Sequence, residues 1–270
     1  MSEQEIPKDK PVSTSEWYDY VGQLTDLLPD IHPGGVEASK ALLDLCNLSS
    51  EDVVLDVGCG SGATACSIAE QYGARVTGVD ISEVMIDQAV KKAKKQGVSE
   101  LVDFRVADVF HLPFDDDSFS VVIFQSVLIA LEGDINAAMG EIIRVLKKGG
   151  LIAGNEGTVN DDTPDHYIKL LGKHPAIHRH FTSDTLRSLY EESGLEVTEL
   201  HESKNVDVKS SGRVGFLKFV VFMYSVYPRM LYKLLRDSKL REASGIDDRV
   251  TKQGKKYAGY TLIVGKNSLI

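Results

Sequence analysis

A glycine-rich loop behind a short apolar run constrains the fold of this chain more than any other feature. Residues 53–65 read VVLDVGCGSGATA, with glycines at every second position from 58 to 62. A helix-forming segment follows through Tyr72, and Gly73 closes it. A buried strand, a glycine turn and a helix in this order are typical of the first unit of a parallel α/β sheet.

The same alternation of strands and helices continues along the chain. Ser82 is expected to cap the helix that ends before Gly97, and Asp134 to cap a helix that runs to Gly149. Apolar and β-branched runs predict the strands. Beyond residues 53–57, the predicted strands cover residues 74–80, 102–108, 119–124, 151–156, 195–200 and 259–267. The sequence therefore predicts a doubly wound α/β sheet of seven strands with helices on both faces.

Composition limits the possible partners and locations. The chain has 270 residues, of which 43% are hydrophobic, enough for one core with an appended subdomain. The net charge of −10 argues against nucleic acid as a partner. The polar start MSEQEIPKDK does not resemble a secretory signal, and the three cysteines lack metal-type spacing. We expect a cytoplasmic protein whose first 15 or so residues are frayed.

The charge of an acid beside the glycine loop helps to decide which class of ligand the loop binds. Gly58, Gly60 and Ala63 match the dinucleotide fingerprint G-x-G-x-x-A, so a nicotinamide or flavin cofactor must be considered. Asp56, two residues before the first glycine, would repel the pyrophosphate of such a cofactor. S-adenosylmethionine instead carries an ammonium and a sulfonium and has no phosphate. The charge at this loop favours S-adenosylmethionine.

Two more acids end the next two predicted strands. Asp80 stands where a carboxylate can accept hydrogen bonds from a ribose diol. Asp108 is placed to accept a hydrogen bond from the exocyclic amine of adenine. Each acid alone is equally well explained as a cap or turn residue. Three successive strands that end in acids favour a ligand site.

Four stretches of the chain resemble a known family. LDVGCGSG, VTGVDIS, ADVFHLPFDDDSFSVVI and EIIRVLKKGG are similar, in order and spacing over roughly residues 41–157, to the successive motifs of class I S-adenosylmethionine-dependent methyltransferases. Within that class they look like the small-molecule branch that includes ubiquinone and menaquinone C-methyltransferases. The resemblance implies a Rossmann-like sheet, mostly parallel with an antiparallel last strand, an N-terminal helical cap, and a helical segment inserted between the last two strands.

The resemblance also divides the chain and implies a set of cofactor-binding residues. Residues 1–40 would be the extension and cap, residues 41–203 with 257–270 the core, and residues 204–256 a substrate lid. The resemblance implies that Gly58, Gly60 and Gly62 contact the methionine and ribose portions of S-adenosylmethionine, and of its product S-adenosylhomocysteine. Asp56 and the backbone carbonyl of Gln125 would bind the ammonium, and Asp80 the ribose. The adenine would contact Ile81, Asp108 and Val109.

The sequence offers candidate catalytic residues without choosing among them. Methyl transfer is an in-line displacement at an activated carbon, so alignment and desolvation supply much of the acceleration. A general base helps only if the acceptor must lose a proton. His32 in DIHPGG, with Tyr18 and Tyr20, is a candidate cap over the donor methyl, and Glu156 is expected just past the fifth strand, near the acceptor. The alternatives are a simple HPGG turn and a polar loop residue.

The histidine-rich stretch HPAIHRH at residues 174–180 is a possible metal-ligand pair. Because no acid or cysteine completes a metal site, we expect a surface helix here and no metal cofactor.

About 50 residues separate the last two predicted strands, and part of this insertion is basic. Residues 213–241 hold seven basic residues and one acid. The segment is open to four interpretations: a buried lid, the wall of an apolar pocket, a peripheral membrane surface, or a dimer contact. We expect transfer of a methyl group to a small, hydrophobic, lipid-like or quinone-like acceptor. The alternatives are a polar metabolite, a protein side chain, or a non-catalytic S-adenosylmethionine-binding protein.

Overall fold

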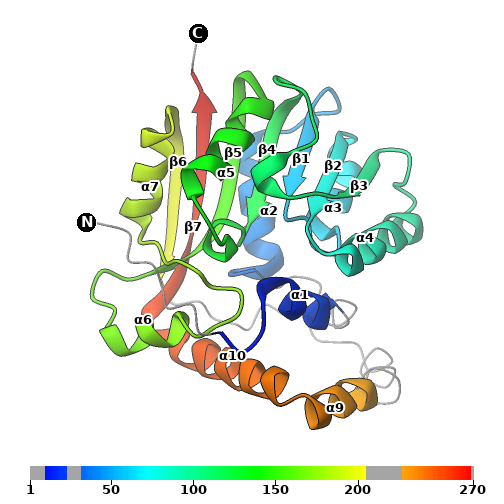
Figure 1. The fold of residues 1–270 in the computed structure, drawn as a ribbon. Helices are drawn as coiled ribbons and strands as arrows, with labels where there is room; N and C mark the ends of the chain where they lie inside the picture. Colours follow the sequence, from blue (N-terminus) through cyan, green and yellow to red (C-terminus); the bar gives the residue numbers. More distant parts are fainter. Residues whose placement is uncertain (1–9, 23–31, 205–226, 269–270) are drawn as a thin grey trace.

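A seven-stranded sheet forms the centre of the molecule (Figure 1). The computed structural model describes residues 10–22, 32–204 and 227–268. The strands stand in the order β3-β2-β1-β4-β5-β7-β6, and all neighbouring pairs are parallel except those of β7 with β5 and β6. Their bounds are β1 Val53–Val57, β2 Arg75–Asp80, β3 Val102–Val106, β4 Phe119–Gln125, β5 Leu146–Val159, β6 Leu195–Lys204 and β7 Ala258–Asn267. The predicted fold class is confirmed.

Helices pack on both faces of the sheet because its central strands are apolar on both sides. On β1, Val54 packs with α2, α3 and α4, whereas its neighbour Leu55 packs with α5 and α7. Successive side chains of a strand point to opposite faces, so a continuous apolar run fits a strand that is covered twice. The helices run over α2 Gly35–Cys46, α3 Ala63–Tyr72, α4 Glu83–Gln96, α5 Ile135–Val145 and α7 Ser183–Glu192.

The predicted helix caps are present, with one error at a helix end. Ser82 accepts a hydrogen bond from the N–H of Met85, and Asp134 accepts one from the N–H of Asn136. The expectation that the helix after Asp134 reaches Gly149 is wrong, because α5 ends at Val145. Its last carbonyls accept hydrogen bonds from the turn before β4, and the chain continues directly as β5.

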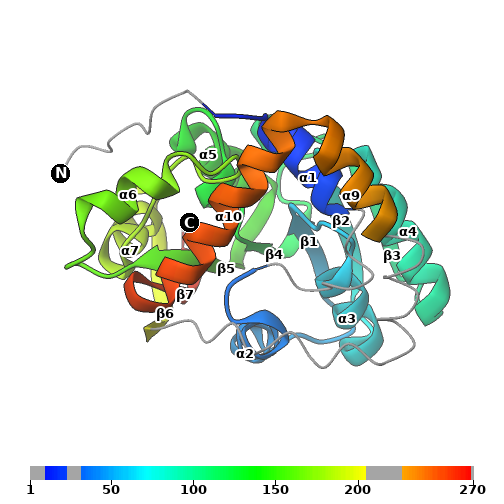
Figure 2. The same cartoon turned by 90° about the horizontal axis from the view of Figure 1, so that it is seen from below.

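Four helices cover the edge where the parallel strands end. α1 (Thr14–Gly22), α6 (Asp165–Leu171), α9 (Tyr227–Arg236) and α10 (Ser238–Tyr257) lie there, as seen from below in Figure 2. Trp17 and Tyr20 of α1 pack against Ala243 of α10 and Leu234 of α9. The predicted N-terminal helix and the helices between the last two strands are therefore present. The apolar stretch of the insertion, residues 214–226, lies outside the described residues.

The expectation that the first 15 or so residues fray is wrong for residues 10–15, which pack on the protein, whereas residues 1–9 lie outside the described residues. The ammonium of Lys10 donates to the carbonyls of Pro175 and Ile177, and Val12 is buried. Burial lowers the pKa of Lys10 to about 8. Within the ranges that the structure describes, no helix is long and apolar enough to cross a membrane.

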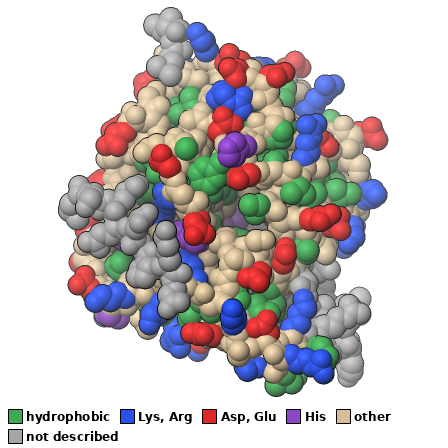
Figure 3. Space-filling view, in the orientation of Figure 1, with side chains coloured by type: hydrophobic (Ala, Val, Ile, Leu, Met, Phe, Trp, Pro, Cys, Tyr) green, Lys and Arg blue, Asp and Glu red, His purple; other side chains and the backbone are tan. Residues whose placement is uncertain are grey.

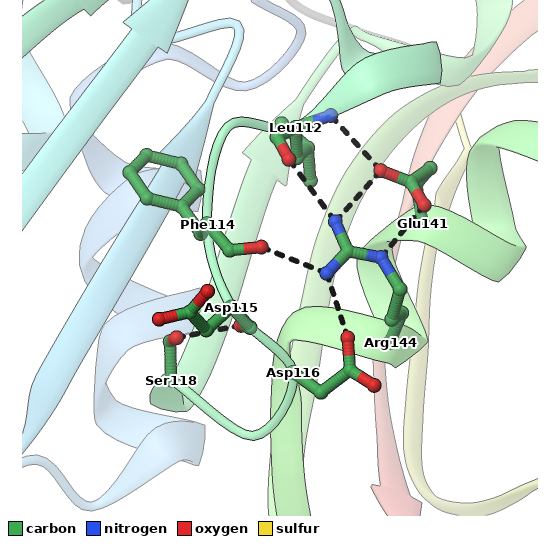
Figure 4. Close-up of polar contacts among 7 residues, drawn as sticks. All are labelled: Leu112, Phe114, Asp115, Asp116, Ser118, Glu141 and Arg144. Carbon is green, nitrogen blue, oxygen red and sulfur yellow. Dashed lines mark hydrogen bonds and ion pairs between the residues drawn. The ribbon is translucent and has the colours of Figure 1, made fainter.

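An arginine clasp links two of the motifs that carry the family resemblance (Figure 4). The Arg144 guanidinium donates to the carbonyls of Leu112 and Phe114 and to the carboxylates of Asp116 and Glu141. Glu141 in turn accepts a hydrogen bond from the N–H of Leu112. The stretch EIIR on α5 thereby fixes the loop that leads from β3 to β4, and this loop begins beside the candidate site.

Candidate functional site

A cavity of about 550 Å³ opens at the carboxyl ends of β1, β2 and β4. This is the edge at which open α/β sheets bind their ligands, and the volume suits a small molecule. Eight of the nine predicted cofactor-binding residues line the cavity: Asp56, Gly58, Gly60, Asp80, Ile81, Asp108, Val109 and Gln125. The exception is Gly62.

The three glycines of the loop differ in their surroundings. Gly58 and Gly60 have φ angles of 64° and 51°, which side chains rarely adopt. A Cβ on Gly60 would meet nothing within 4 Å, so this glycine borders open space in the cavity. A Cβ on Gly62, in contrast, would lie 2.8 Å from both Ala89 and Phe104. Gly62 thus lets the loop pack closely against Ala89 of α4 and Phe104 of β3.

Asp56 is a buried carboxylate with one unsatisfied oxygen. Asp56 is only 3% exposed, and its Oδ2 has no hydrogen-bond partner among the described residues. Burial raises the pKa of Asp56 to about 7, although a hydrogen bond from the N–H of Ala65 opposes the shift. An unpaired buried carboxylate is costly, and a cationic group beside it would remove the cost. The site therefore favours a ligand with a positive charge at this point.

The other two acids hold loop backbone and still face the cavity. Asp80 accepts hydrogen bonds from the N–H groups of Gly60 and Ser82, each at 2.9 Å. Asp108 is exposed and accepts one from the N–H of Phe110 at 3.0 Å. Asp108 is thus a helix cap and Asp80 a turn residue, as the alternative interpretation of these acids expected. Each carboxylate keeps lone pairs for a ligand, since one oxygen can accept more than one hydrogen bond.

Ile81 adds an apolar surface to the cavity. Its side chain is 56% exposed although the residue lines the pocket. An apolar side chain with this exposure is suited to cover the face of an aromatic ring.

Of the candidate catalytic residues, His32 and Tyr18 line the cavity, and Tyr20 and Glu156 do not. Tyr20 packs against Trp17, with 5.9 Å between ring centroids. Glu156 lies within β5 rather than past it, because β5 extends to Val159. Its side chain is fully buried and faces backbone N–H groups instead of the cavity.

A polar network that the sequence did not reveal surrounds His32. The Oγ of Ser39 lies 3.0 Å from Nε2 of His32 and donates to Oε1 of Gln125. The side-chain amide of Asn155 lies 3.2 Å from Nδ1 of His32 and also donates to Gln125. Gln125 completes the network by donating to Oγ1 of Thr64 at 2.8 Å. These residues come from four separate parts of the chain, so no spacing in the sequence could link them.

The histidines of residues 174–180 form no surface helix. They lie in the irregular segment after α6, where the ring of His174 meets Asp247 at 3.2 Å and packs edge-on against Trp17. Nε2 of His178 lies 2.7 Å from Oγ1 of Thr14. Burial lowers the pKa of His178 to about 4. Among the described residues, no cluster of three or more His, Cys, Asp or Glu side chains is placed to hold a metal ion.

Comparison with known proteins finds a family match in the central region of the chain. Residues 54–150 match the family model described as a methyltransferase domain. The uncharacterized methyltransferase YodH of Bacillus subtilis is 35% identical over 133 residues, which are 49% of this chain and 55% of YodH. A sterol 24-C-methyltransferase of Gibberella zeae is 37% identical over 127 residues, 43% of this chain and 32% of that enzyme. The chain spans between about half and two thirds of the length of its most similar curated relatives.

Solved structures share the fold over more of the chain. The [4+2]-cyclase SpnF has a TM-score of 0.71 and 22% identity, with 98% of this chain and 99% of that chain covered. The geranyl diphosphate C-methyltransferase from Streptomyces coelicolor, solved with S-adenosylhomocysteine, has a TM-score of 0.64 and 18% identity, with 86% and 78% covered. At these identities the likeness shows the fold alone.

The raised pKa of Asp56 gives a pH prediction for ligand binding. A ligand ammonium is attracted only by the ionised carboxylate, so the affinity for S-adenosylhomocysteine should rise by up to about tenfold per pH unit below the pKa and level off above it. The stability of the free protein has the opposite pH dependence. Because the pKa of Asp56 is raised from 3.8 to about 7, the free protein loses stability as the pH rises between these two values, and the loss is complete above the raised pKa.

Calorimetric titration from pH 5.5 to 8.5, a range chosen to bracket that pKa of about 7, measures this slope. Asp56→Asn keeps the size of the side chain and removes the charge, and it should bind more weakly with a flatter profile. Because other carboxylates near the site also titrate, the comparison of the two profiles is decisive. Identical slopes in both proteins would remove Asp56 from the ligand site.

Proposed function

Because residues 54–150 match the family model of a methyltransferase domain, we propose that the protein transfers the methyl group of S-adenosylmethionine to a small-molecule acceptor. The family match and the seven-stranded fold agree with the predicted class I domain and its cofactor. The observation that carries the proposal in this chain is the unpaired, buried oxygen of Asp56, a residue that lines the cavity.

The residues that line the cavity fit S-adenosylmethionine better than a dinucleotide. Asp56 suits the ligand's ammonium, Asp80 suits a ribose diol, and Ile81 and Asp108 suit an adenine. A pyrophosphate would instead face three carboxylates, and no Lys or Arg is among the described residues that line the cavity. In a poorly screened site this charge arrangement opposes a dinucleotide.

The bound donor would supply a methyl group already activated by its sulfonium, so the protein's own task is mainly to align the reactants and exclude water. Tyr18 lines the cavity, and burial raises its pKa, so its hydroxyl stays protonated and serves as a hydrogen-bond donor rather than a base. His32 is held by Ser39 and Asn155 through its two ring nitrogens. We therefore assign His32 to orienting the methionine end of the donor, and assign no general base.

For the acceptor we propose a hydrophobic, lipid-like or quinone-like molecule. Similar proteins named for their substrates act on a sterol, on geranyl diphosphate and on phosphoethanolamine. A sterol and a geranyl group are both large hydrocarbon skeletons, and α9, in the described part of the insertion, exposes apolar side chains. A polar metabolite or a protein side chain is the second candidate. SpnF, named a cyclase, has the same fold, so a non-methylating protein is the third.

Methyl transfer can be tested without knowing the acceptor. The protein is incubated with S-adenosylmethionine labelled in the methyl group and with either the organic or the aqueous fraction of a cell extract. Labelled product in the organic fraction is expected, together with stoichiometric S-adenosylhomocysteine. The variant Asp80→Ala, which removes a charged partner for the ribose, should lower product formation at subsaturating donor by about tenfold or more.

The matched control is Asp134→Ala, because Asp134 caps α5 and does not line the cavity. Label in the aqueous fraction alone would favour the polar acceptor. Binding of S-adenosylmethionine without product from either fraction would favour the non-catalytic protein.

We also propose that α9 rests on an anionic membrane surface, from which an apolar acceptor would be drawn. Leu231, Tyr232 and Leu235 are exposed on this helix, and Leu235 is 67% exposed. Lys233 and Arg236 stand among them, and Lys239 and Arg241 follow on α10. Figure 3 shows hydrophobic and basic side chains together along the lower edge of the molecule, where α9 and α10 lie. Apolar side chains bordered by basic ones suit an anionic bilayer interface.

This surface is connected to the cavity through α1. Leu234 and Leu240 face the protein and pack with the cluster that contains Trp17 of α1. The first residues of α1, Thr14 and Ser15, line the cavity. A membrane contact at α9 would therefore lie one helix away from the ligand.

Sedimentation with vesicles tests the membrane proposal. The protein should bind vesicles of phosphatidylcholine with phosphatidylserine more tightly than vesicles of phosphatidylcholine alone, and less tightly at high salt. The double variant Leu231→Ser, Leu235→Ser should weaken binding by about tenfold or more. Val36→Ser is the control, because Val36 is 54% exposed but lies on α2. Equal binding of both variants would refute the assignment of this surface.

A further inference from the structure

The segment that follows β4 forms one wall of the cavity. Gln125, Ser126 and Val127 line the cavity, and so do Ala130, the last residue of the short 3-10 helix η2 (Leu128–Ala130), and Leu131. This wall packs closely against the glycine loop. The space that a Cβ on Gly58 would need is taken by Val127, whose Cγ2 would lie only 2.5 Å from that Cβ. The position of Val127 therefore sets the space available above Gly58.

This wall is held in an unusual backbone conformation. Ser126 has a φ of 57°, in the left-handed region that non-glycine residues seldom adopt. Its N–H donates to the carbonyl of Asn155 on β5 at 2.8 Å. Strained backbone of this kind persists only where its surroundings fix it.

Glu156, the next residue on β5, supplies the fixing contacts. Its Oε1 accepts hydrogen bonds from the N–H of Val127 at 2.9 Å and of Leu128 at 3.0 Å, and its Oε2 accepts one from the N–H of Ile129 at 3.3 Å. The residue is 0% exposed. These donors lie at the first turn of a 3-10 helix, where backbone N–H groups have no partner within the helix.

We propose that Glu156 is a positioning residue, whose carboxylate fixes residues 127–129 and thereby shapes the cofactor side of the cavity without touching the ligand. A buried carboxylate is expensive unless hydrogen bonds satisfy it, and the three backbone N–H groups supply those bonds. All three bonds converge on the segment that contacts Gly58 through Val127 and lines the cavity. Burial raises the pKa of Glu156 to about 7, while the three N–H donors oppose that rise.

The substitution Glu156→Gln separates this role from general stability. The amide oxygen can still accept from Val127 and Leu128, but the amide nitrogen would face the N–H of Ile129, donor against donor. The exchange rate of the backbone amides should therefore rise by about tenfold at residues 127–129 and remain unchanged in the strands of the sheet. The dissociation constant of S-adenosylhomocysteine, a probe that rests on the proposed function, should rise by about tenfold as well.

The control Thr158→Val lies on the same strand. Thr158 is buried and bonded to Thr261, but it does not line the cavity. This variant should leave both readouts as in the wild type. If Glu156→Gln fails to fold, Glu156→Asp, which keeps both oxygens on a shorter side chain, is measured instead.

Exchange that is faster only at residues 127–129 supports the proposal. Unchanged exchange there, a uniform rise throughout the sheet, or the same effects in Thr158→Val would overturn it. If the wild-type protein does not bind S-adenosylhomocysteine, the proposed function fails, whereas the exchange readout still decides the role of Glu156.

Discussion

The candidate site depends on one constraint, a carboxylate buried near the carboxyl end of β1. Asp56 is covered on both sides because β1 lies between β2 and β4 and under helices on both faces. One of its oxygens has no partner within the described residues. A fold that leaves an ionisable oxygen in this state is adapted to a ligand that brings a positive charge. The open space above Gly60 lets such a ligand approach.

Other parts of the structure hold the walls of this site in place. The Arg144 clasp fixes the loop after β3, which starts with Asp108 and Val109 in the cavity. Asn155 and Glu156 fix the segment after β4 from the neighbouring strand. α1 closes the side that faces α9 and α10. Each wall is thus held by residues outside the cavity, which lets the lining residues remain available to a ligand.

The sequence predicted those features that depend on residues close together in the chain. Strand and helix alternation, the caps at Ser82 and Asp134, and the acids at strand ends follow from residues close together in the chain, and the structure contains them. The sequence could not reveal the network of His32, Ser39 and Asn155, because contacts between distant elements leave no spacing pattern. The packing role of Gly62 escaped the sequence for the same reason: only the contact with α4 and Phe104 shows why a side chain is excluded there. The position of Glu156 depended on the length of β5, which its pairing with β7 extends to Val159.

The most direct test of the central claim is calorimetric titration of the wild-type protein with S-adenosylmethionine, S-adenosylhomocysteine and NADH. If the carboxylates at the strand ends select a cationic, phosphate-free ligand, the first two should bind with dissociation constants on the order of micromolar and NADH should not bind. Binding of NADH without S-adenosylmethionine or S-adenosylhomocysteine would mean that the glycine loop holds a pyrophosphate, and it would contradict the assignment of Asp56 and the methyltransferase function together.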